Sequence, residues 1–151
     1  MKDEVADKCG SAGVYAVVAA AVITDKSTGR FLLCRRPESK ADALLWEFPG
    51  GKTEKGESAR EALVRECKEE LGTEVVVEEH VADISGRKQK GSILVSFFFV
   101  QADTEAIRAL EHKEMRWVTL RQAMSLELCA ADKEFLLRAG DIVEKKCRCD
   151  M

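Results

Sequence analysis

The sequence is short of proline, lacks asparagine, and contains neither a long hydrophobic run nor an excess of basic residues. Its 151 residues include two prolines and one tyrosine. The longest apolar stretch, Val14 to Ile23, has half of the about 20 residues that a membrane-spanning helix needs. Lysine and arginine number 24 against 27 acidic residues, which gives a formal charge of −3. Such a chain has no general electrostatic attraction to a nucleic-acid polymer. We therefore predict neither a membrane nor a nucleic acid as its partner.

The N-terminal sequence MKDEVADK is acidic and lacks the basic start and apolar core of a signal peptide. This predicts a cytoplasmic protein whose six cysteines stay reduced. Cys34 and Cys67 fall within apolar patterns, so we expect them to pack as small hydrophobic residues. Cys147 and Cys149 form a close pair, but the whole chain holds only two histidines and no second cysteine pair. A structural zinc site is therefore not predicted, and these two thiols are expected in a frayed tail.

Length and composition favour one folded domain of mixed α and β structure. Hydrophobic residues make up 46% and charged residues 34%, which excludes a disordered or fibrous chain. We predict a loose leader over residues 1–12, a domain over 13–140 and a tail over 141–151. An aromatic segment at 44–51 closes on a Pro-Gly-Gly turn. The patterns predict strands at 14–23, 30–34, 74–84, 92–102 and 115–120, and helices at 58–71 and 130–139.

The helix at 58–71 carries the clearest local signals. Ser58 and Glu61 form a capping box, and Gly72 stands where a left-handed residue would end the helix. A helical wheel separates an apolar arc from one acidic stripe, which contains Glu66, Glu69 and Glu70. Like charges three and four residues apart destabilise a helix, most of all near its C-terminal end.

The acidic stripe therefore needs an explanation, and a solvated surface is the simplest one. Two features favour a metal site instead. Ala59 and Ala62 are small residues that we place on the acidic side, where they would leave space. The upstream Gly50 and Gly51 would let the backbone come close to the carboxylates. A dense set of oxygen ligands is what Mg²⁺ or Mn²⁺ requires.

The glycines and the acidic helix resemble the signature motif of a known protein family. Gly51, Glu57 and then Arg65-Glu66-Cys67-Lys68-Glu69-Glu70-Leu71-Gly72-Thr73 resemble the Nudix box, G-x5-E-x7-R-E-U-x-E-E-x-G-U, in which U is a bulky aliphatic residue. All seven fixed letters are present, while Cys67 and Thr73 are smaller or more polar than usual at the U positions. WEFPGGK before the box looks most like MutT-type enzymes, in the 8-oxo-dGTP diphosphatase and CTP pyrophosphohydrolase branch. The resemblance implies an α/β/α sandwich with a mixed β-sheet.

The resemblance also implies a chemistry for the acidic stripe. Gly51, Glu66, Glu69 and Glu70 would hold Mg²⁺, with Mn²⁺ as a substitute, and Glu111 is a further candidate ligand. The catalytic base would be Glu66, Glu69 or Glu111. Glu57 would support Arg65 and the adjoining loop. The reaction implied is the hydrolysis of a nucleoside triphosphate to a monophosphate and pyrophosphate.

The residues that would bind the nucleotide lie outside the box. By the same resemblance, Arg35 and Lys52 would contact phosphate, and Phe48 would either line a base pocket or belong to the core. Asp132 stands where MutT enzymes read 8-oxoguanine with an asparagine. His112 is expected at the surface. We predict nucleotide-pool sanitation and DNA repair through 8-oxo-dGTP, with CTP, dCTP or a modified cytosine nucleotide as the alternative. An inactive nucleotide-binding module is a further alternative, and the chain would be a monomer or a homodimer.

Overall fold

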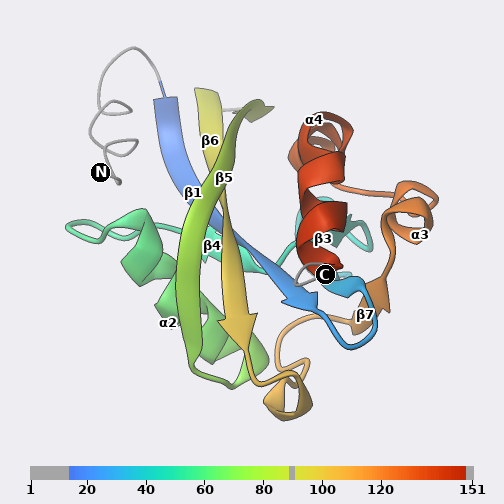
Figure 1. Cartoon of the computed structure of the whole chain (residues 1–151). Helices are drawn as coiled ribbons and strands as arrows, with labels where there is room; N and C mark the ends of the chain where they lie inside the picture. The colour runs from blue at the N-terminus through green and yellow to red at the C-terminus, as the bar shows by residue number, and fades with distance from the viewer. Residues whose placement is uncertain (1–13, 89–90, 149–151) are drawn as a thin grey trace.

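A mixed β-sheet lies between two helical layers, with α2 on one face and α4 on the other (Figure 1). The computed structural model describes residues 14–88 and 91–148. The predicted leader at 1–12, together with Cys9 and Cys149, lies outside the described residues. The strands are β1 (Val14–Asp25), β2 (Arg30–Arg35), β3 (Trp46–Glu47), β4 (Gly50–Lys52), β5 (Val75–Lys88), β6 (Gly91–Ala102) and β7 (Glu114–Val118).

The strands pair in the order β3-β2-β1-β6-β5, with β4 on β1 and β7 on β2. β1 and β6 run parallel, whereas the pairs β1–β2, β1–β4, β2–β7 and β5–β6 are antiparallel. This mixture of directions confirms the predicted α/β class. The expected strands at 74–84 and 115–120 differ at their ends, because β5 continues to Lys88 and β7 stops at Val118.

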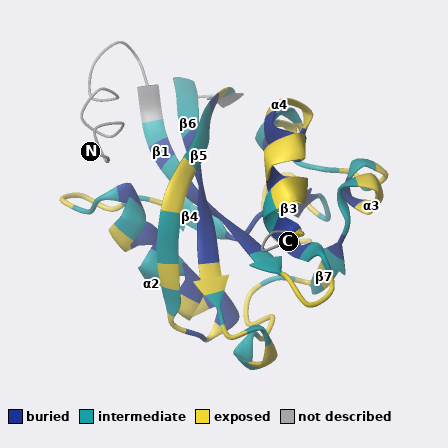
Figure 2. Cartoon of the chain, viewed as in Figure 1, coloured by how far each residue is buried: buried dark blue, intermediate teal, exposed yellow. Residues whose placement is uncertain are grey.

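β1 is buried on both faces, as its continuous apolar pattern predicts. Ala20 and Val22 belong to the apolar core on the α4 side, and Ala19 and Ile23 belong to the core on the α2 side. Figure 2 colours much of β1 as buried. The small alanines allow both helices to approach the sheet at its centre. Two apolar cores result, one on each side of the sheet.

α2 (Ala59–Leu71) begins and ends where the sequence predicts. Ser58 and Glu61 form the capping box, and Gly72 closes the helix in the left-handed conformation. Cys67 is buried and free, as is Cys34 on β2. The placement of Ala59 and Ala62 beside the acids is wrong, because both are buried in the core between α2 and the sheet. Their small size serves close packing.

α4 (Ala130–Cys147) is longer than the pattern predicted. The expected helix end at Ala139 is wrong, and residues 141–147 of the expected tail form its last turns. Val143 and Cys147 bury their side chains in the core, which is why the helix continues. α3 (Leu120–Met124) and a short 3₁₀ helix (Thr104–Ala106) were not predicted. Among the described residues, no helix has the length and apolar character needed to cross a membrane.

Candidate active site

Two glycines bring the β4 backbone against the acidic helix. Gly50 and Gly51 pair with Ala20 and Ala19 of β1, which fixes them at the centre of the sheet. A Cβ atom on Gly51 would lie 2.4 Å from Oε2 of Glu66. The absence of a side chain at position 51 therefore makes room for the Glu66 carboxylate.

The buried Glu70 faces Gly50 on the same strand. The backbone N–H of Gly50 donates to Oε1 of Glu70 at 3.2 Å, and the Glu70 side chain is 10% exposed. Burial, together with a hydrogen bond to Glu66 and the charge of that residue, raises the pKa of Glu70 to about 9. Glu66 and Glu70 thus share a crowded space in which one proton relieves their repulsion.

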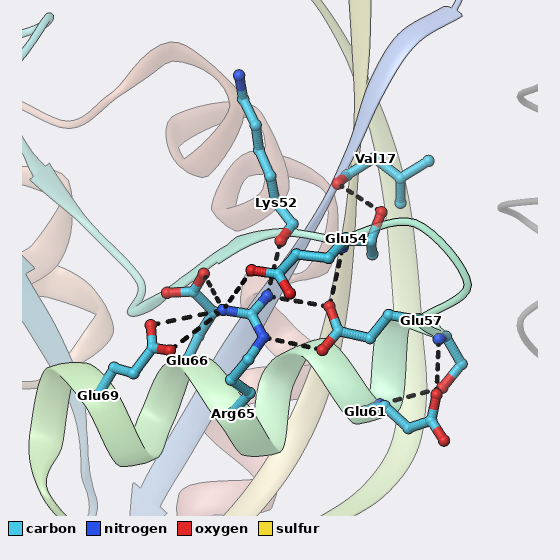
Figure 3. Close-up of polar contacts among 10 residues, drawn as sticks. Val17, Lys52, Glu54, Glu57, Glu61, Arg65, Glu66 and Glu69 are labelled. Carbon is cyan, nitrogen blue, oxygen red and sulfur yellow. Dashed lines mark hydrogen bonds and ion pairs between the residues drawn. The ribbon is translucent and has the colours of Figure 1, made fainter.

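Arg65 organises the outer side of this cluster (Figure 3). Its guanidinium donates to both oxygens of Glu57, at 2.8 and 2.9 Å, and to the carbonyl oxygen of Lys52 at 3.1 Å. It also reaches Glu66 at 3.0 Å and Glu69 at 3.4 Å. The hydrogen bond with Glu57 is the main reason that the pKa of Arg65 is raised and that of Glu57 is lowered. The contacts with Glu57 and Lys52 provide the loop support predicted from the sequence.

The three stripe glutamates differ in their surroundings. Glu70 points inward, Glu66 lies over Gly51, and Glu69 is 49% exposed beside Arg65. Within residues 14–88 and 91–148, no three acidic, histidine or cysteine side chains already converge at metal-binding spacing. The residues nevertheless fit a divalent cation. They offer hard oxygen donors, a glycine that leaves room beside Glu66, and carboxylates whose repulsion a cation would relieve.

Glu111 is exposed in the loop before β7. In the described part of the chain, no hydrogen bond or ion pair joins it to the stripe glutamates. Its roles as metal ligand and base remain predictions.

A second polar cluster surrounds Glu47, which the sequence analysis did not single out. Arg36 donates to Oε1 of Glu47 at 2.9 Å, and Nε2 of His112 lies 3.0 Å from Oε2. Sγ of Cys129 is 4.0 Å from Oε1. The expected surface position of His112 is wrong, because its side chain is only 6% exposed. A charged residue between two aromatic ones in Trp-Glu-Phe was the available signal for this cluster.

Of the two adjacent arginines, Arg36 lies in the Glu47 cluster and Arg35 does not. Arg35 donates through Nε to the carbonyl of Leu44 at 3.0 Å and lies over the Trp46 ring, 5.8 Å from its centre. Side chains that follow one another in extended chain point in opposite directions. The role of Arg35 as a phosphate contact stays a prediction, and Arg36 is a second candidate for that contact.

Phe48 belongs to the core, which is one of the two roles predicted for it, and its role in a base pocket stays a prediction. Its side chain is 3% exposed, and its ring contacts those of Phe31, Phe97 and Phe135. Lys52 is exposed, and its side chain extends away from the carboxylates in Figure 3.

Asp132 lies in the first turn of α4 and is buried. Its Oδ1 accepts a hydrogen bond from the backbone N–H of Phe48 at 3.1 Å. Burial, followed by the charge of Glu47, raises the pKa of Asp132 to about 8. At neutral pH this carboxyl can therefore carry a proton and donate a hydrogen bond as well as accept one.

The raised pKa of Asp132 predicts a pH-dependent stability. The folded protein favours the protonated carboxyl, so this contribution is complete below the unfolded pKa of about 4 and is lost as the pH rises through about 8. Asp132→Asn removes the titration while keeping the acceptor for Phe48. Between pH 5 and pH 9 we expect the variant to gain about 2 kcal/mol or more relative to the unmodified chain. Urea unfolding at several pH values measures this difference.

Asp141→Asn, an exposed position on the same helix, is the matched control and should not alter the pH dependence. Parallel stability curves for the unmodified chain and Asp132→Asn would contradict the prediction.

A cavity of about 460 Å³ adjoins Asp132 along the chain. It is lined by Ser85, Gly86, Ser92, Ala130, Ala131 and Glu134, and so lies between the β5–β6 hairpin and the start of α4. Its volume is within the range of about 300–1,000 Å³ typical of small-molecule sites. Its lining residues Ala130 and Ala131 directly precede Asp132, which does not itself line the cavity.

The chain is similar to known proteins in both sequence and fold. Residues 14–139 match the NUDIX domain. The CTP pyrophosphohydrolase of Escherichia coli (strain K12) is 41% identical over 120 residues, which cover 77% of this chain and 84% of that protein. The 8-oxo-dGTP diphosphatase of Proteus vulgaris is 37% identical over 83 residues, covering 55% of this chain and 73% of that protein. The crystal structure of the MutT protein from Methanosarcina mazei Go1 superposes with a TM-score of 0.75 at 28% identity, covering 87% of this chain and 97% of that one.

Proposed function

Because the chain belongs to the Nudix hydrolase family, we propose that it hydrolyses a nucleoside triphosphate to a monophosphate and pyrophosphate with the help of Mg²⁺. The observation that carries this proposal is the arrangement of Glu66 and Glu70 against the Gly50–Gly51 turn. A triphosphate is strongly anionic and would be repelled by these carboxylates without a cation. When bound there, Mg²⁺ or Mn²⁺ would neutralise phosphate oxygens and activate a water molecule.

The protein's own residues would hold the cation, position the ligands and accept the proton of water. Glu66, Glu69 and Glu70 would hold the cation, with the Gly51 carbonyl as a further ligand. Arg65, fixed by Glu57, would keep Glu66 and Glu69 on the outer side of the turn. The base that takes the proton from water would be Glu66, Glu69 or Glu111.

The nucleotide end of the site would lie beside Glu47, Asp132 and the cavity at the start of α4. Arg36, which is ion-paired with Glu47, would be the cation that meets phosphate or base there. A protonated Asp132 can donate and accept at once, so it suits the N3 and amino edge of cytosine as well as the N1 and O6 edge of 8-oxoguanine. The chemistry of this residue therefore permits both bases.

We propose cytosine nucleotides as the first substrates and 8-oxo-dGTP as the second. The greater identity and coverage shared with the CTP pyrophosphohydrolase favour this order over the one predicted from the sequence. Both substrates are free nucleotides, which is consistent with a cytoplasmic role in cleansing the nucleotide pool and with a chain that acts as a monomer or a homodimer.

Pyrophosphate release tests the proposal. We would compare kcat/KM for CTP, 5-methyl-dCTP, 8-oxo-dGTP and dGTP with Mg²⁺, using ADP-ribose as a substrate of a different kind. We expect pyrophosphate from at least one triphosphate and a higher kcat/KM for CTP or 5-methyl-dCTP than for dGTP. Cleavage of ADP-ribose alone would place the chain in another branch, and tight nucleotide binding without turnover would favour an inactive module.

A further inference from the structure

His112 lies between the Glu47 carboxylate and the proposed metal ligand Glu70. Its Nε2 is 3.0 Å from Oε2 of Glu47 and 4.0 Å from Oε1 of Glu70. Its Nδ1 is buried and has no hydrogen-bond partner among the described residues. Carboxylate oxygens accept hydrogen bonds, so the imidazole donates from Nε2. An apolar residue would fill this space without an orphaned nitrogen, and packing alone therefore does not explain a histidine here.

His112 lies between two carboxylates, those of Glu47 and Glu70, that other groups also hold in place. Oε1 of Glu47 accepts from Arg36 at 2.9 Å, so His112 occupies the second oxygen of the same group. On the other side, Oε1 of Glu70 accepts from the N–H of Gly50 at 3.2 Å. The imidazole separates two carboxylates that would otherwise face each other across a buried space.

The backbone holds His112 in place independently of its side chain. Leu110 donates to the carbonyl of Glu70 at 3.0 Å, and Arg108 donates to that of Leu71 at 3.0 Å. On the other side of His112, Lys113 donates to the carbonyl of Arg35 at 2.9 Å. The loop is thus tied to the end of α2 and to β2, so a substitution at position 112 should leave its path unchanged.

We propose that His112, fixed by its hydrogen bond to Glu47, is a positioning residue that lies against the Glu70 carboxylate and keeps it in place for a divalent cation. The inference rests on the proposed function, because it takes Glu70 as a ligand of the cation. Residues around the ligands of a metal fix the orientation of those ligands, and loss of such a neighbour costs about 10–100-fold in metal affinity or activity.

Metal binding without nucleotide tests this role. Mn²⁺ binding, followed by electron paramagnetic resonance, should be about 10-fold or more weaker for His112→Ala than for the unmodified chain. In turnover assays, the Mg²⁺ concentration for half-maximal rate should rise, while the nucleotide KM at saturating Mg²⁺ should change much less. A loss of folded protein would lower kcat alone and would not move the Mg²⁺ requirement.

Two conservative variants separate positioning from packing. The side-chain amide nitrogen of glutamine reaches about as far as the imidazole Nε2, so His112→Gln should recover most of the Mn²⁺ affinity. Asparagine is shorter and reaches only the position of Nδ1, so His112→Asn should not recover it. Comparing the Mn²⁺ affinities of the glutamine and asparagine variants tests the positioning role even if His112→Ala fails to fold. His80→Ala, at the exposed second histidine, should bind Mn²⁺ normally.

Unchanged Mn²⁺ affinity in His112→Ala would overturn the inference, as would a glutamine variant no better than the asparagine variant. A chain that binds Mn²⁺ in a manner dependent on His112 but cleaves no triphosphate would overturn the proposed function alone.

Discussion

Replacing Glu66 with glutamine is expected to lower kcat by about 10³-fold, which corresponds to about 4 kcal/mol of lost transition-state stabilisation. Glu66 lies directly over Gly51 and contacts Arg65 at 3.0 Å. Glutamine keeps the size and one oxygen but removes the negative charge that a cation would need. Pyrophosphate release at saturating nucleotide and Mg²⁺ measures the loss, and circular dichroism verifies the fold.

The same helix supplies the control. Glu61→Gln makes the same chemical change at an exposed position, and glutamine can still complete the capping box with Ser58. This variant should retain normal turnover. Glu69→Gln, in which the exposed stripe residue is changed, is also expected to abolish turnover if Glu69 is a ligand. A Glu66→Gln enzyme with more than about a tenth of normal kcat would contradict the assignment, since removing one transition-state contact typically costs at least about 10²-fold.

Local signals predicted the elements well where one physical preference dominates. The capping box and Gly72 set both ends of α2, and the apolar run at 14–23 gave a strand buried on both faces. The end of α4 was missed because long-range packing of Val143 and Cys147 decides it. Ala59 and Ala62 were misplaced because small size is compatible with an open space and with close packing alike.

The candidate site was predictable only where spacing along one helix determines it. Glu57 and Arg65 meet because the loop and helix bring them together as the box implies. The Glu47 cluster instead depends on β2, β3, the loop before β7 and the start of α4, which are far apart in sequence. The sequence analysis therefore expected His112 at the surface and did not single out Arg36. The sequence pattern also did not show which way the side chain of each of the adjacent arginines, Arg35 and Arg36, points.

Gly50→Ala is expected to cost the fold about 3 kcal/mol or more, from backbone strain and overpacking together. Gly50 has a φ of +149°, and an added Cβ would lie 2.0 Å from the carbonyl oxygen of Ala19. That oxygen belongs to β1 at the centre of the sheet, so it cannot move aside as a flexible side chain could. Any shift of β4 would also disturb the hydrogen bond from Gly50 to Glu70. Urea unfolding gives the free energy, and turnover of the folded fraction reports the site.

Gly56→Ala is the matched control, because it separates backbone strain from steric overlap. Gly56 also has a positive φ, +81°, but no described atom lies within 4 Å of the Cβ that alanine would add. We expect this variant to lose about 1 kcal/mol and to keep its activity. Equal losses for Gly50→Ala and Gly56→Ala would mean that contact with β1 does not restrict position 50. A larger loss at Gly50, accompanied by lower turnover, would tie the close approach of β4 and β1 to the placement of Glu70.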